Sequence, residues 1–130
     1  MTRLAYVDAS AIVKLVVAEA ESMAFLRWFV EADRVTTSTV GLIETRRAAA
    51  RRAHEAAHRE YILSEFEVLA LSEDVAARSA AAEPPSLRAL DAIHLASALA
   101  LGPELDAFVT YDDRLADAAR RVGLPVVRPA

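Results

Sequence analysis

Short apolar runs that alternate with helix-length segments constrain the fold of this chain more than any other feature. Each run is rich in β-branched or large apolar residues, which is typical of buried strands. The runs fall at residues 4–7, 34–39, 65–71, 106–113 and 124–129. Because parallel strands are joined by crossover helices, this alternation predicts a mostly parallel sheet of about five strands. Helices then cover both faces of the sheet, in a three-layer α/β/α sandwich.

The helical segments carry local start and stop signals. The segment 11–32 contains one break, and the segment 40–63 could be one long helix or two. Ser72 and Ser86 each precede a helical segment and are predicted N-caps, because a serine side chain can accept a hydrogen bond from the first turn. Gly123 is predicted to close the last helix, since glycine is common just after a helix C-terminus.

Length and composition bound the class of protein. The chain has 130 residues, of which 55% are hydrophobic, so we expect one folded domain over residues 1–130. It has no cysteine, which excludes disulfides and thiolate metal sites and fits a reducing cytoplasm. There is no apolar stretch long enough to span a membrane and no signal-peptide pattern, so we expect a cytoplasmic protein. The formal net charge of −4 argues against a general polyanion binder, so nucleic-acid contact requires a local basic patch or a bound metal.

Acidic residues stand where the predicted strands end. Asp8 closes the first strand and Asp112 follows the fourth. Glu44 lies about one turn into the helix after the second strand, and Asp91 lies in the first turns of its own helix. In open parallel sheets, sites form at the carboxyl ends of the strands. Several ionised carboxylates in one pocket repel each other, so the arrangement predicts a bound cation, and oxygen ligands favour Mg²⁺ or Mn²⁺.

Asp91 raises the sharpest question, because it lies in the apolar segment LRALDAIHLASALAL. At about 100° per residue, it shares a helix side with Leu95 and Ala98, and that side should face a core. A lone buried carboxylate costs several kcal/mol unless its charge is compensated. A shared metal would compensate the charge of Asp91, and so would an ion pair with Arg88 or His94. Apart from that possibility, we expect His94 to be packed in the core or hydrogen-bonded.

Each acid also has a purely structural interpretation. Asp8 could cap the helix that follows it, and Asp112 and Asp113 could be turn and cap residues. Glu44 could be a solvated helix residue. Ser10 could help to cap the helix after Asp8, which we favour, or hold a metal-bound water.

Four segments together resemble the PIN-domain family, and in particular the VapC-type toxins of bacterial toxin–antitoxin pairs. They are YVDASAIVKL, STVGLIETRRA, LRALDAIHLASAL and FVTYDDRLADAARRVGL, which stand in the family's order and cover nearly the whole chain. The resemblance implies a single PIN domain over residues 1–130. It assigns four acids to a catalytic metal site: Asp8, Glu44, Asp91 and Asp112. Asp113 could take the place of Asp112 if the turn is shifted by one residue.

The same resemblance implies a Mg²⁺- or Mn²⁺-dependent endoribonuclease that cleaves single-stranded or loop RNA. A VapB-type antitoxin would block the acidic pocket, and we also expect a homodimer without membrane attachment. Thr110 and Ser10 would support the acids. The basic run at residues 46–59 could be a solvated surface or could guide RNA. The apolar segments 11–17 and 23–30 could face the core, or could bind the antitoxin or a second copy.

Two other classes of protein match parts of the pattern. A PIN-like fold could serve only for binding, although a binding module has no use for a costly carboxylate cluster. A phospho-receiver domain also has an acidic Mg²⁺ pocket, but it needs an aspartate at the end of its third strand and a lysine at the end of its fifth. Here the third predicted strand ends in Leu71 and Ser72, and the only lysine is Lys14, just after the first strand.

Overall fold

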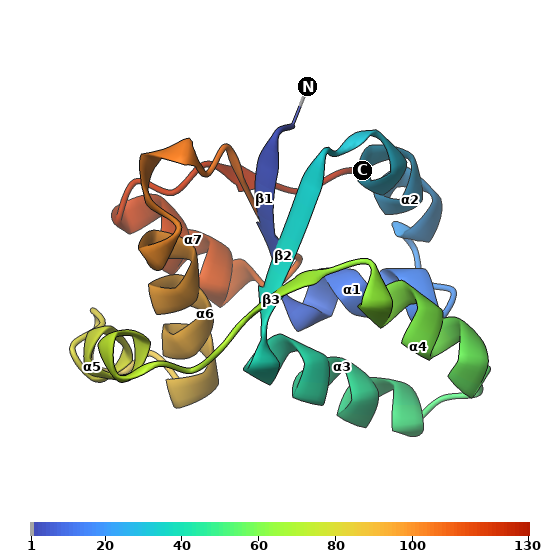
Figure 1. Cartoon of the computed structure of the whole chain (residues 1–130), viewed down its shortest axis with the longest axis horizontal. Helices are drawn as coiled ribbons and strands as arrows, with labels where there is room; N and C mark the ends of the chain where they lie inside the picture. The colour runs from blue at the N-terminus through green and yellow to red at the C-terminus, as the bar shows by residue number, and fades with distance from the viewer. Residues whose placement is uncertain (1) are drawn as a thin grey trace.

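A five-stranded parallel sheet runs through the centre of the computed structural model, which describes residues 2–130 (Figure 1). The strands in spatial order are β3 (Glu67–Leu69), β2 (Arg34–Ser38), β1 (Leu4–Val7), β4 (Ala107–Val109) and β5 (Val126–Val127). All neighbouring strands pair in parallel, and β1 is the central strand. The predicted sheet is confirmed, with shorter strands than the apolar runs indicated.

Side chains of the central strand alternate between two buried layers. Ala5 and Val7 pack in an apolar cluster on one face of the sheet, and Leu4 and Tyr6 pack in a second cluster on the other face. Because successive residues of a strand point to opposite faces, a strand that is covered on both sides is apolar throughout. This double burial explains the continuous run LAYV.

The helices form the two outer layers (Figure 1). The face of Ala5 and Val7 is covered by α1 (Ala9–Val16), α2 (Ser22–Glu31), α3 (Thr39–Ala50) and α4 (Ala56–Ser64). The face of Leu4 and Tyr6 is covered by α6 (Ala89–Ala100) and α7 (Asp113–Arg121), with α5 (Glu73–Ala80) packed against α6 and a short 3₁₀ turn at Gly102–Glu104. The predicted three-layer α/β/α sandwich is therefore confirmed.

The predicted signals at Ser72 and Gly123 are confirmed, and the structure decides the segment that could have been one helix or two. The segment 40–63 is two helices, since α3 ends at Ala50 and α4 begins at Ala56. Ser72 caps α5 by accepting a hydrogen bond from the backbone N–H of Val75 at 3.1 Å. Gly123 closes α7 with a φ of 82°, a backbone conformation that favours glycine.

The predicted N-cap at Ser86 is wrong. α6 begins at Ala89, and Arg88 occupies the N-cap position without a side-chain cap hydrogen bond. Ser86 instead lies inside a turn in which the backbone N–H of Leu87 donates to the carbonyl of Pro84 at 2.9 Å. This turn holds Ser86 two residues before the N-cap position, Arg88.

The two apolar segments near the N-terminus differ in burial. Residues 11–17 are all buried, so this segment faces the core. In residues 23–30, Phe25 is buried but Met23 and Val30 are 63% and 69% exposed. Within residues 2–130, each helix is too short or too polar to cross a bilayer.

The order of the strands argues against a phospho-receiver. Receiver-type doubly wound sheets have the order 2-1-3-4-5, whereas the order here is 3-2-1-4-5. In the present order β1 lies between β2 and β4, so the carboxyl ends of these three strands meet at one edge of the sheet. Asp8, Glu44 and Asp112 follow those three ends along the chain.

Candidate active site

Asp8 is fixed at the carboxyl end of the central strand. Its side chain is 3% exposed and caps α1, with Oδ1 accepting a hydrogen bond from the backbone N–H of Ala11 at 3.1 Å. Ser10 Oγ also donates to Oδ1, and Thr110 Oγ1 donates to Oδ2, both at 2.6 Å. Burial raises the pKa of the Asp8 carboxyl, and these donors oppose the rise. The cap that the sequence allowed is confirmed, and Oδ2 keeps a lone pair for a further partner.

Thr110 links Asp8 to Asp112. Its Oγ1 donates to Asp8 and accepts a hydrogen bond from the backbone N–H of Asp112 at 3.0 Å. Asp112 in turn caps α7, because its Oδ1 accepts a hydrogen bond from the backbone N–H of Leu115 at 3.0 Å. One buried hydroxyl thus sets the position of two acids that are far apart in the sequence.

Asp113 points away from this arrangement. Its side chain is 87% exposed, and its Oδ1 accepts a hydrogen bond from Arg128 at 2.7 Å. Of the two neighbouring aspartates, Asp112 is the one tied to Asp8.

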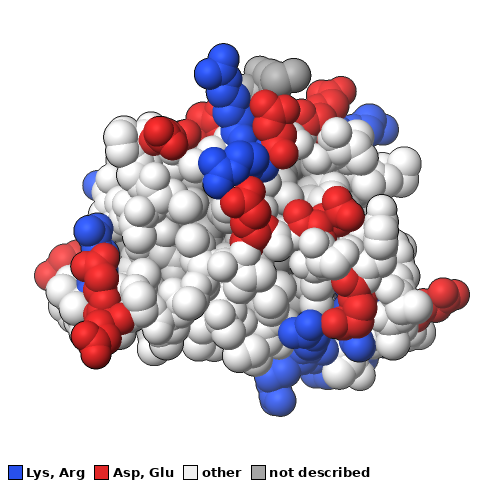
Figure 2. Space-filling view, viewed as in Figure 1, with Lys and Arg blue, Asp and Glu red and all other residues white. Residues whose placement is uncertain are grey.

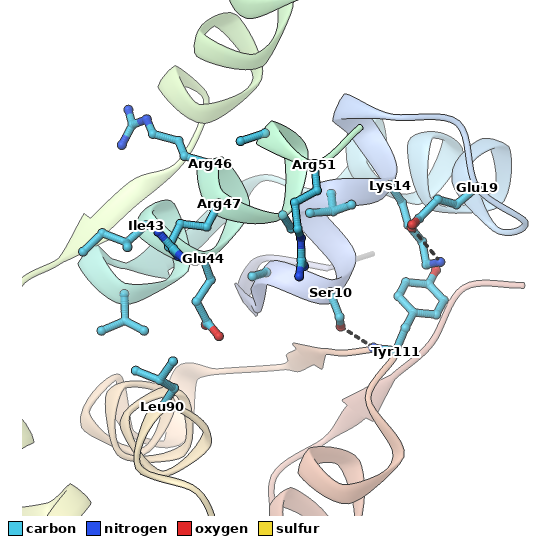
Figure 3. A pocket seen from close by; sticks show the side chains of 15 residues that line it. Ser10, Lys14, Glu19, Ile43, Glu44, Arg46, Arg47, Arg51, Leu90 and Tyr111 are labelled. Carbon is cyan, nitrogen blue, oxygen red and sulfur yellow. Dashed lines mark hydrogen bonds and ion pairs between the residues drawn. The ribbon is translucent and has the colours of Figure 1, made fainter. Parts of the chain in front are cut away.

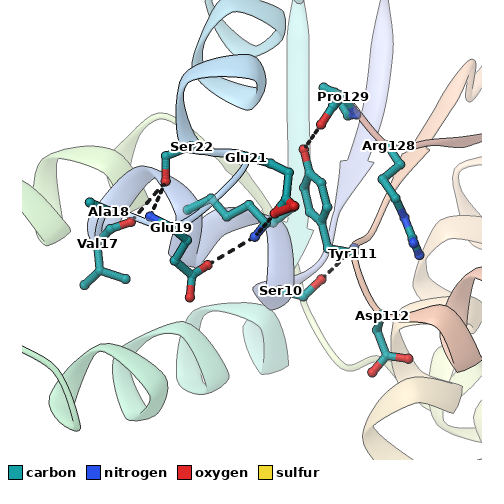
Figure 4. A network of polar contacts seen from close by, with 12 residues as sticks. Ser10, Val17, Ala18, Glu19, Glu21, Ser22, Tyr111, Asp112, Arg128 and Pro129 are labelled. Carbon is teal, nitrogen blue, oxygen red and sulfur yellow. Dashed lines mark hydrogen bonds and ion pairs between the residues drawn. The ribbon is translucent and has the colours of Figure 1, made fainter.

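The loop after β4 is held from two sides (Figure 4). Ser10 Oγ, besides donating to Asp8, accepts a hydrogen bond from the backbone N–H of Tyr111 at 2.9 Å. The Tyr111 hydroxyl donates to the carbonyl of Pro129 at 2.6 Å, and Lys14 Nζ lies 4.5 Å from the centre of its ring. The prediction that Ser10 is a capping residue is wrong, because Asp8 holds the N-cap position and Ser10 serves to orient Asp8.

A tight junction between β2 and α3 positions Glu44. Ser38, the last residue of β2, accepts a hydrogen bond from the backbone N–H of Gly41 at 3.1 Å. A Cβ at position 41 would lie 2.1 Å from Thr37 Oγ1, so only glycine lets the helix start this close to the strand. Glu44 lies further along α3, is partly buried, and has Oε1 at 2.5 Å from His94 Nε2.

A buried hydrogen-bonded chain holds Glu44. His94 is 2% exposed, and its Nδ1 lies 2.7 Å from the hydroxyl of Tyr6, which is fully buried in β1. Burial raises the pKa of Tyr6, so its hydroxyl keeps its proton. A neutral imidazole has one donor and one acceptor. The consistent assignment is that Tyr6 donates to Nδ1 of His94 and Nε2–H of His94 donates to Glu44.

The expectation that His94 is hydrogen-bonded is therefore confirmed, but the sequence did not reveal its partners. Tyr6 is 88 residues away from His94 along the chain. The apolar run around Tyr6 signals only a buried strand, and the tyrosine hydroxyl in that run was the one available sign of a buried polar contact.

The side chain of Asp91 has no hydrogen bond or ion pair with any of residues 2–130, so the direct contact with Arg88 or His94 that the spacing allowed is not formed. Its side chain is half-buried at the start of α6, while His94, one turn on, is fully used by Tyr6 and Glu44. Burial raises the pKa of the Asp91 carboxyl, and the negative charge of Asp112 raises it further. His94 and Arg88 act in the opposite direction and lower the pKa of Asp91, and Glu44 again raises it, so the net change is a rise.

The structure thus brings Asp91 within electrostatic reach of Asp112 and Glu44, and it links Asp8 to Asp112 through Thr110, but it does not close the four acids around one point. In the described part of the chain, no three His, Cys, Asp or Glu side chains are grouped closely enough to hold a metal ion. The donor set nevertheless fits a hard divalent cation, because all the candidate ligands are carboxylate oxygens. Asp91, a half-buried charge without a partner, is the group that such a cation would stabilise most.

A groove of about 850 Å³ lies between α1 and α3, and Glu44 is the one of the four candidate acids that lines it (Figure 3). Its walls include Glu44, Leu90 and Tyr111 together with several basic side chains. In Figure 3, Arg51 reaches from α3 into the groove toward Ser10, whereas Arg46 points away from it.

The basic side chains of α3 and of the turn that follows it differ in how they are paired. On the face shown in Figure 2, basic side chains gather over α3 at the lower edge of the molecule, next to carboxylates. Arg46 binds Glu60 at 2.8 Å, and Arg52 binds Glu19 at 2.6 Å. Arg47 and Arg51 have no carboxylate partner within residues 2–130, and both line the groove.

Comparison with known proteins gives consistent results. The model of the PIN domain family matches residues 5–121. Ribonuclease VapC47 of Mycobacterium tuberculosis is 37% identical over 130 residues, which cover 95% of this chain and 96% of that protein.

Solved structures share the fold at low sequence identity. The crystal structure of Mycobacterium tuberculosis VapC20, a sarcin–ricin loop cleaving toxin, has a TM-score of 0.75 at 19% identity and covers 96% of this chain and 99% of its own. VapBC2 of Rickettsia felis, bound to a DNA fragment from its promoter, has a TM-score of 0.69 at 10% identity. The match covers 98% of this chain and 99% of the VapBC2 chain.

The hydrogen-bonded chain yields a prediction about Tyr6. Replacing Tyr6 by Phe keeps the ring and removes the donor to His94, so we expect the free energy of unfolding to fall by about 1–2 kcal/mol. Nitrogen NMR of His94 should show a proton on Nε2 and none on Nδ1 in the wild type, and the Nδ1 signal should shift in Tyr6→Phe. Tyr61→Phe, at a position that is 63% exposed, is the matched control and should change neither measurement. A proton found on Nδ1 would reverse the donor assignment.

The uncompensated charge yields a prediction about Asp91. Because the pKa of Asp91 is raised in the folded state, its ionised form is less favourable in the folded chain than in the unfolded one. Asp91→Asn removes the charge and keeps the shape, so the metal-free variant should be as stable as wild type or more stable at neutral pH. The advantage should disappear as the pH falls through the folded pKa, since the wild-type carboxyl is then protonated too. Urea unfolding in EDTA at several pH values measures this difference, and a destabilised Asn variant at neutral pH would show that the carboxylate makes a favourable contact.

Proposed function

The chain belongs to the PIN-domain family, and we propose that it is a metal-dependent endoribonuclease that acts as the toxin of a toxin–antitoxin pair. The relative at 37% identity is a ribonuclease of the VapC type, which supports RNA as the substrate. The observation that carries the proposal is the half-buried Asp91, whose side chain has no direct partner among residues 2–130 and whose pKa is raised by the charges of Asp112 and Glu44. We place this activity in the cytoplasm, where RNA is available.

Four carboxylates are proposed to hold the metal: Asp8, Glu44, Asp91 and Asp112. We propose Mg²⁺, with Mn²⁺ as a substitute, because the site offers oxygen ligands and lacks cysteine. When bound, such an ion acidifies a coordinated water and neutralises charge on the scissile phosphate. No serine, cysteine or histidine nucleophile is needed.

The residues around the acids have distinct tasks in this proposal. Ser10 and Thr110 hold Asp8 in one orientation, so that its free lone pair is presented at the edge of the sheet. His94 occupies Oε1 of Glu44, which leaves Oε2 available to bind the metal or to orient the attacking water. We expect Asp91→Asn to abolish RNA cleavage, although it should not lower metal-free stability.

The groove between α1 and α3 is suited to single-stranded RNA. It combines apolar wall residues such as Ile43, Leu90 and Tyr111 with the unpaired Arg47 and Arg51. Aromatic and apolar side chains can contact unstacked bases, and arginines can contact phosphates. This combination supports loop or single-stranded RNA over duplex RNA.

We further propose a VapB-type antitoxin as the partner and a homodimer as the assembly. The fold shared with the VapBC2 assembly supports the first of these. Met23, Leu26 and Val30 are exposed at positions of α2 that lie on one side of the helix, and they provide an apolar surface for either contact. An arginine of the antitoxin would neutralise the acids in place of the metal.

A catalytically silent binding module is the alternative function. It would share the fold, but it would gain nothing from keeping a half-buried, uncompensated Asp91. Cleavage of total RNA in Mn²⁺ separates the two alternatives, because the binding module leaves the RNA intact.

The metal site yields a prediction about two neighbouring aspartates. A cation that binds only the folded state should raise stability by about 1.4 kcal/mol at ten times its dissociation constant. Asp112→Asn should lose most of the rise in thermal midpoint with millimolar Mg²⁺ or Mn²⁺ and should lose RNA cleavage. Asp113→Asn changes the net charge equally but removes only an exposed contact with Arg128, so it should keep both. If Asp113→Asn loses the stabilisation and the cleavage while Asp112→Asn keeps both, Asp113 is the metal ligand. If neither Mg²⁺ nor Mn²⁺ shifts the thermal midpoint of the wild type, the metal site is refuted.

The groove yields a prediction about the arginines of α3. The Arg47→Ala, Arg51→Ala double variant should bind single-stranded RNA about tenfold more weakly, because each side chain contacts phosphate. The slope of log affinity against log salt should become shallower by about 1.4 if two phosphate contacts are lost. Arg46→Ala, Arg52→Ala is the control, since it removes the same charge from arginines paired with carboxylates. Equal losses in the two double variants would assign the effect to net charge rather than to the groove.

A further inference from the structure

We propose that a second cleft, between α7 and the turn before α6, binds phosphate groups of the RNA on the side of the acids away from the α1–α3 groove. This inference rests on the proposed ribonuclease function. The cleft, called the α6–α7 cleft below, has a volume of about 400 Å³. Its charged lining residues are Arg88, Asp91, Arg114, Asp117 and Arg121.

The α6–α7 cleft has one helix face as its floor. Arg114, Asp117, Ala118 and Arg121 all line it and are spaced i, i+3, i+4 and i+7 along α7, which places them on one face of the helix. Arg114 and Arg121 are two turns apart, about 10 Å along the axis, so this row can contact more than one phosphate. Arg88 faces them from the N-cap of α6.

The first turn of α6 separates the cleft from the groove. Leu90 lines the α1–α3 groove, and the next residue, Asp91, lines the α6–α7 cleft. Glu44 lies in the wall of the groove, and its charge acts on Asp91. Glu44 and Asp91 therefore line two cavities that adjoin at the first turn of α6, and an RNA strand that passes over this turn can enter both.

Unpaired positive charge is concentrated in these two cavities. Within residues 2–130, the arginines without an ion-pair partner are Arg3, Arg27, Arg47, Arg51, Arg88, Arg114 and Arg121. Two of them line the groove and three line the cleft, so only two lie elsewhere. The one other acid that lines the cleft is Asp117, and its Oδ1 lies 3.5 Å from Nη1 of Arg120. This positive charge reduces the repulsion between Asp117 and a bound anion.

An endonuclease needs positive charge on both sides of its acids. The substrate strand continues in both directions from the bond that is cut, and phosphates near Asp91 and Asp112 are repelled by these carboxylates. Arg47 and Arg51 can hold the strand on one side only. The arginines of the α6–α7 cleft provide the matching attraction on the other side, which favours RNA over an acidic protein as the occupant.

The test compares two double variants with the same change in net charge. Arg114→Gln, Arg121→Gln removes the floor of the cleft, and Arg3→Gln, Arg27→Gln removes the two unpaired arginines outside both cavities. Affinity for a fluorescent single-stranded RNA is measured in EDTA at several salt concentrations, and cleavage is measured in Mg²⁺. We expect the cleft variant to bind about tenfold more weakly, with a salt slope shallower by about 1.4, and to raise KM more than it lowers kcat. Its Mg²⁺ affinity by calorimetry should equal that of the wild type.

The possible outcomes separate this inference from the proposed function. If the wild type binds and cuts RNA and both variants behave alike, the α6–α7 cleft does not hold RNA, while the ribonuclease function stands. If the wild type neither binds nor cuts RNA, the proposed function fails and the inference fails with it. Arg114→Lys, Arg121→Lys keeps the charge and should recover most of the affinity. A lysine variant that is as weak as the glutamine variant, at an unchanged thermal midpoint, would also overturn phosphate binding by charge.

Discussion

The buried carboxylate of Asp8 is the constraint on which the rest of the site depends. It ends the central strand, where both faces of the sheet are covered and an unpaired charge would cost several kcal/mol. Ser10, Thr110 and the start of α1 satisfy it together. Thr110 Oγ1 also accepts a hydrogen bond from the backbone N–H of Asp112. The residue that stabilises the buried charge of Asp8 therefore also fixes the position of Asp112.

Helix α6 carries two titratable residues with opposite roles. His94 is buried between Tyr6 and Glu44, so its polar atoms are satisfied and the helix is joined to β1 and α3. Asp91, one turn earlier, is half-buried and has no partner in the described residues, so its charge is a cost to the folded state. A folded domain tolerates such a cost where function requires it, and this is the physical reason why we propose Asp91, rather than His94, as a metal ligand.

The arginines at the surface also divide into those that are paired with a carboxylate and those that are not. Most surface pairs, such as Arg34 with Glu67, are exposed and contribute little to stability. Within residues 2–130, five of the seven arginines that lack a carboxylate partner line the groove or the α6–α7 cleft instead. A chain with a net charge of −4 can therefore present a basic path to a polyanion without being basic overall.

The sequence alone determined the layers of the fold and the identity of the candidate acids. Strand and helix periodicity are local properties, so the parallel sheet and the caps at Asp8, Ser72 and Asp112 could be predicted from neighbouring residues. What the sequence left open were contacts between distant segments, such as that of Tyr6 with His94, because no local pattern encodes which side chains meet. The caps of Ser10 and Ser86 were predicted wrongly for a related reason, since a competing residue or turn takes the position in space.

Only the tertiary structure decided how the charges are compensated. Asp91 could have paired with Arg88 or His94 by spacing, and Arg47 could have been paired like Arg46, which binds Glu60. Helix packing directs His94 to Glu44 and leaves Asp91 and Arg47 without partners. The sequence determines which charges exist, whereas the packing of helices against the sheet determines which of them are neutralised, because electrostatic energy depends on distance and burial rather than on order along the chain.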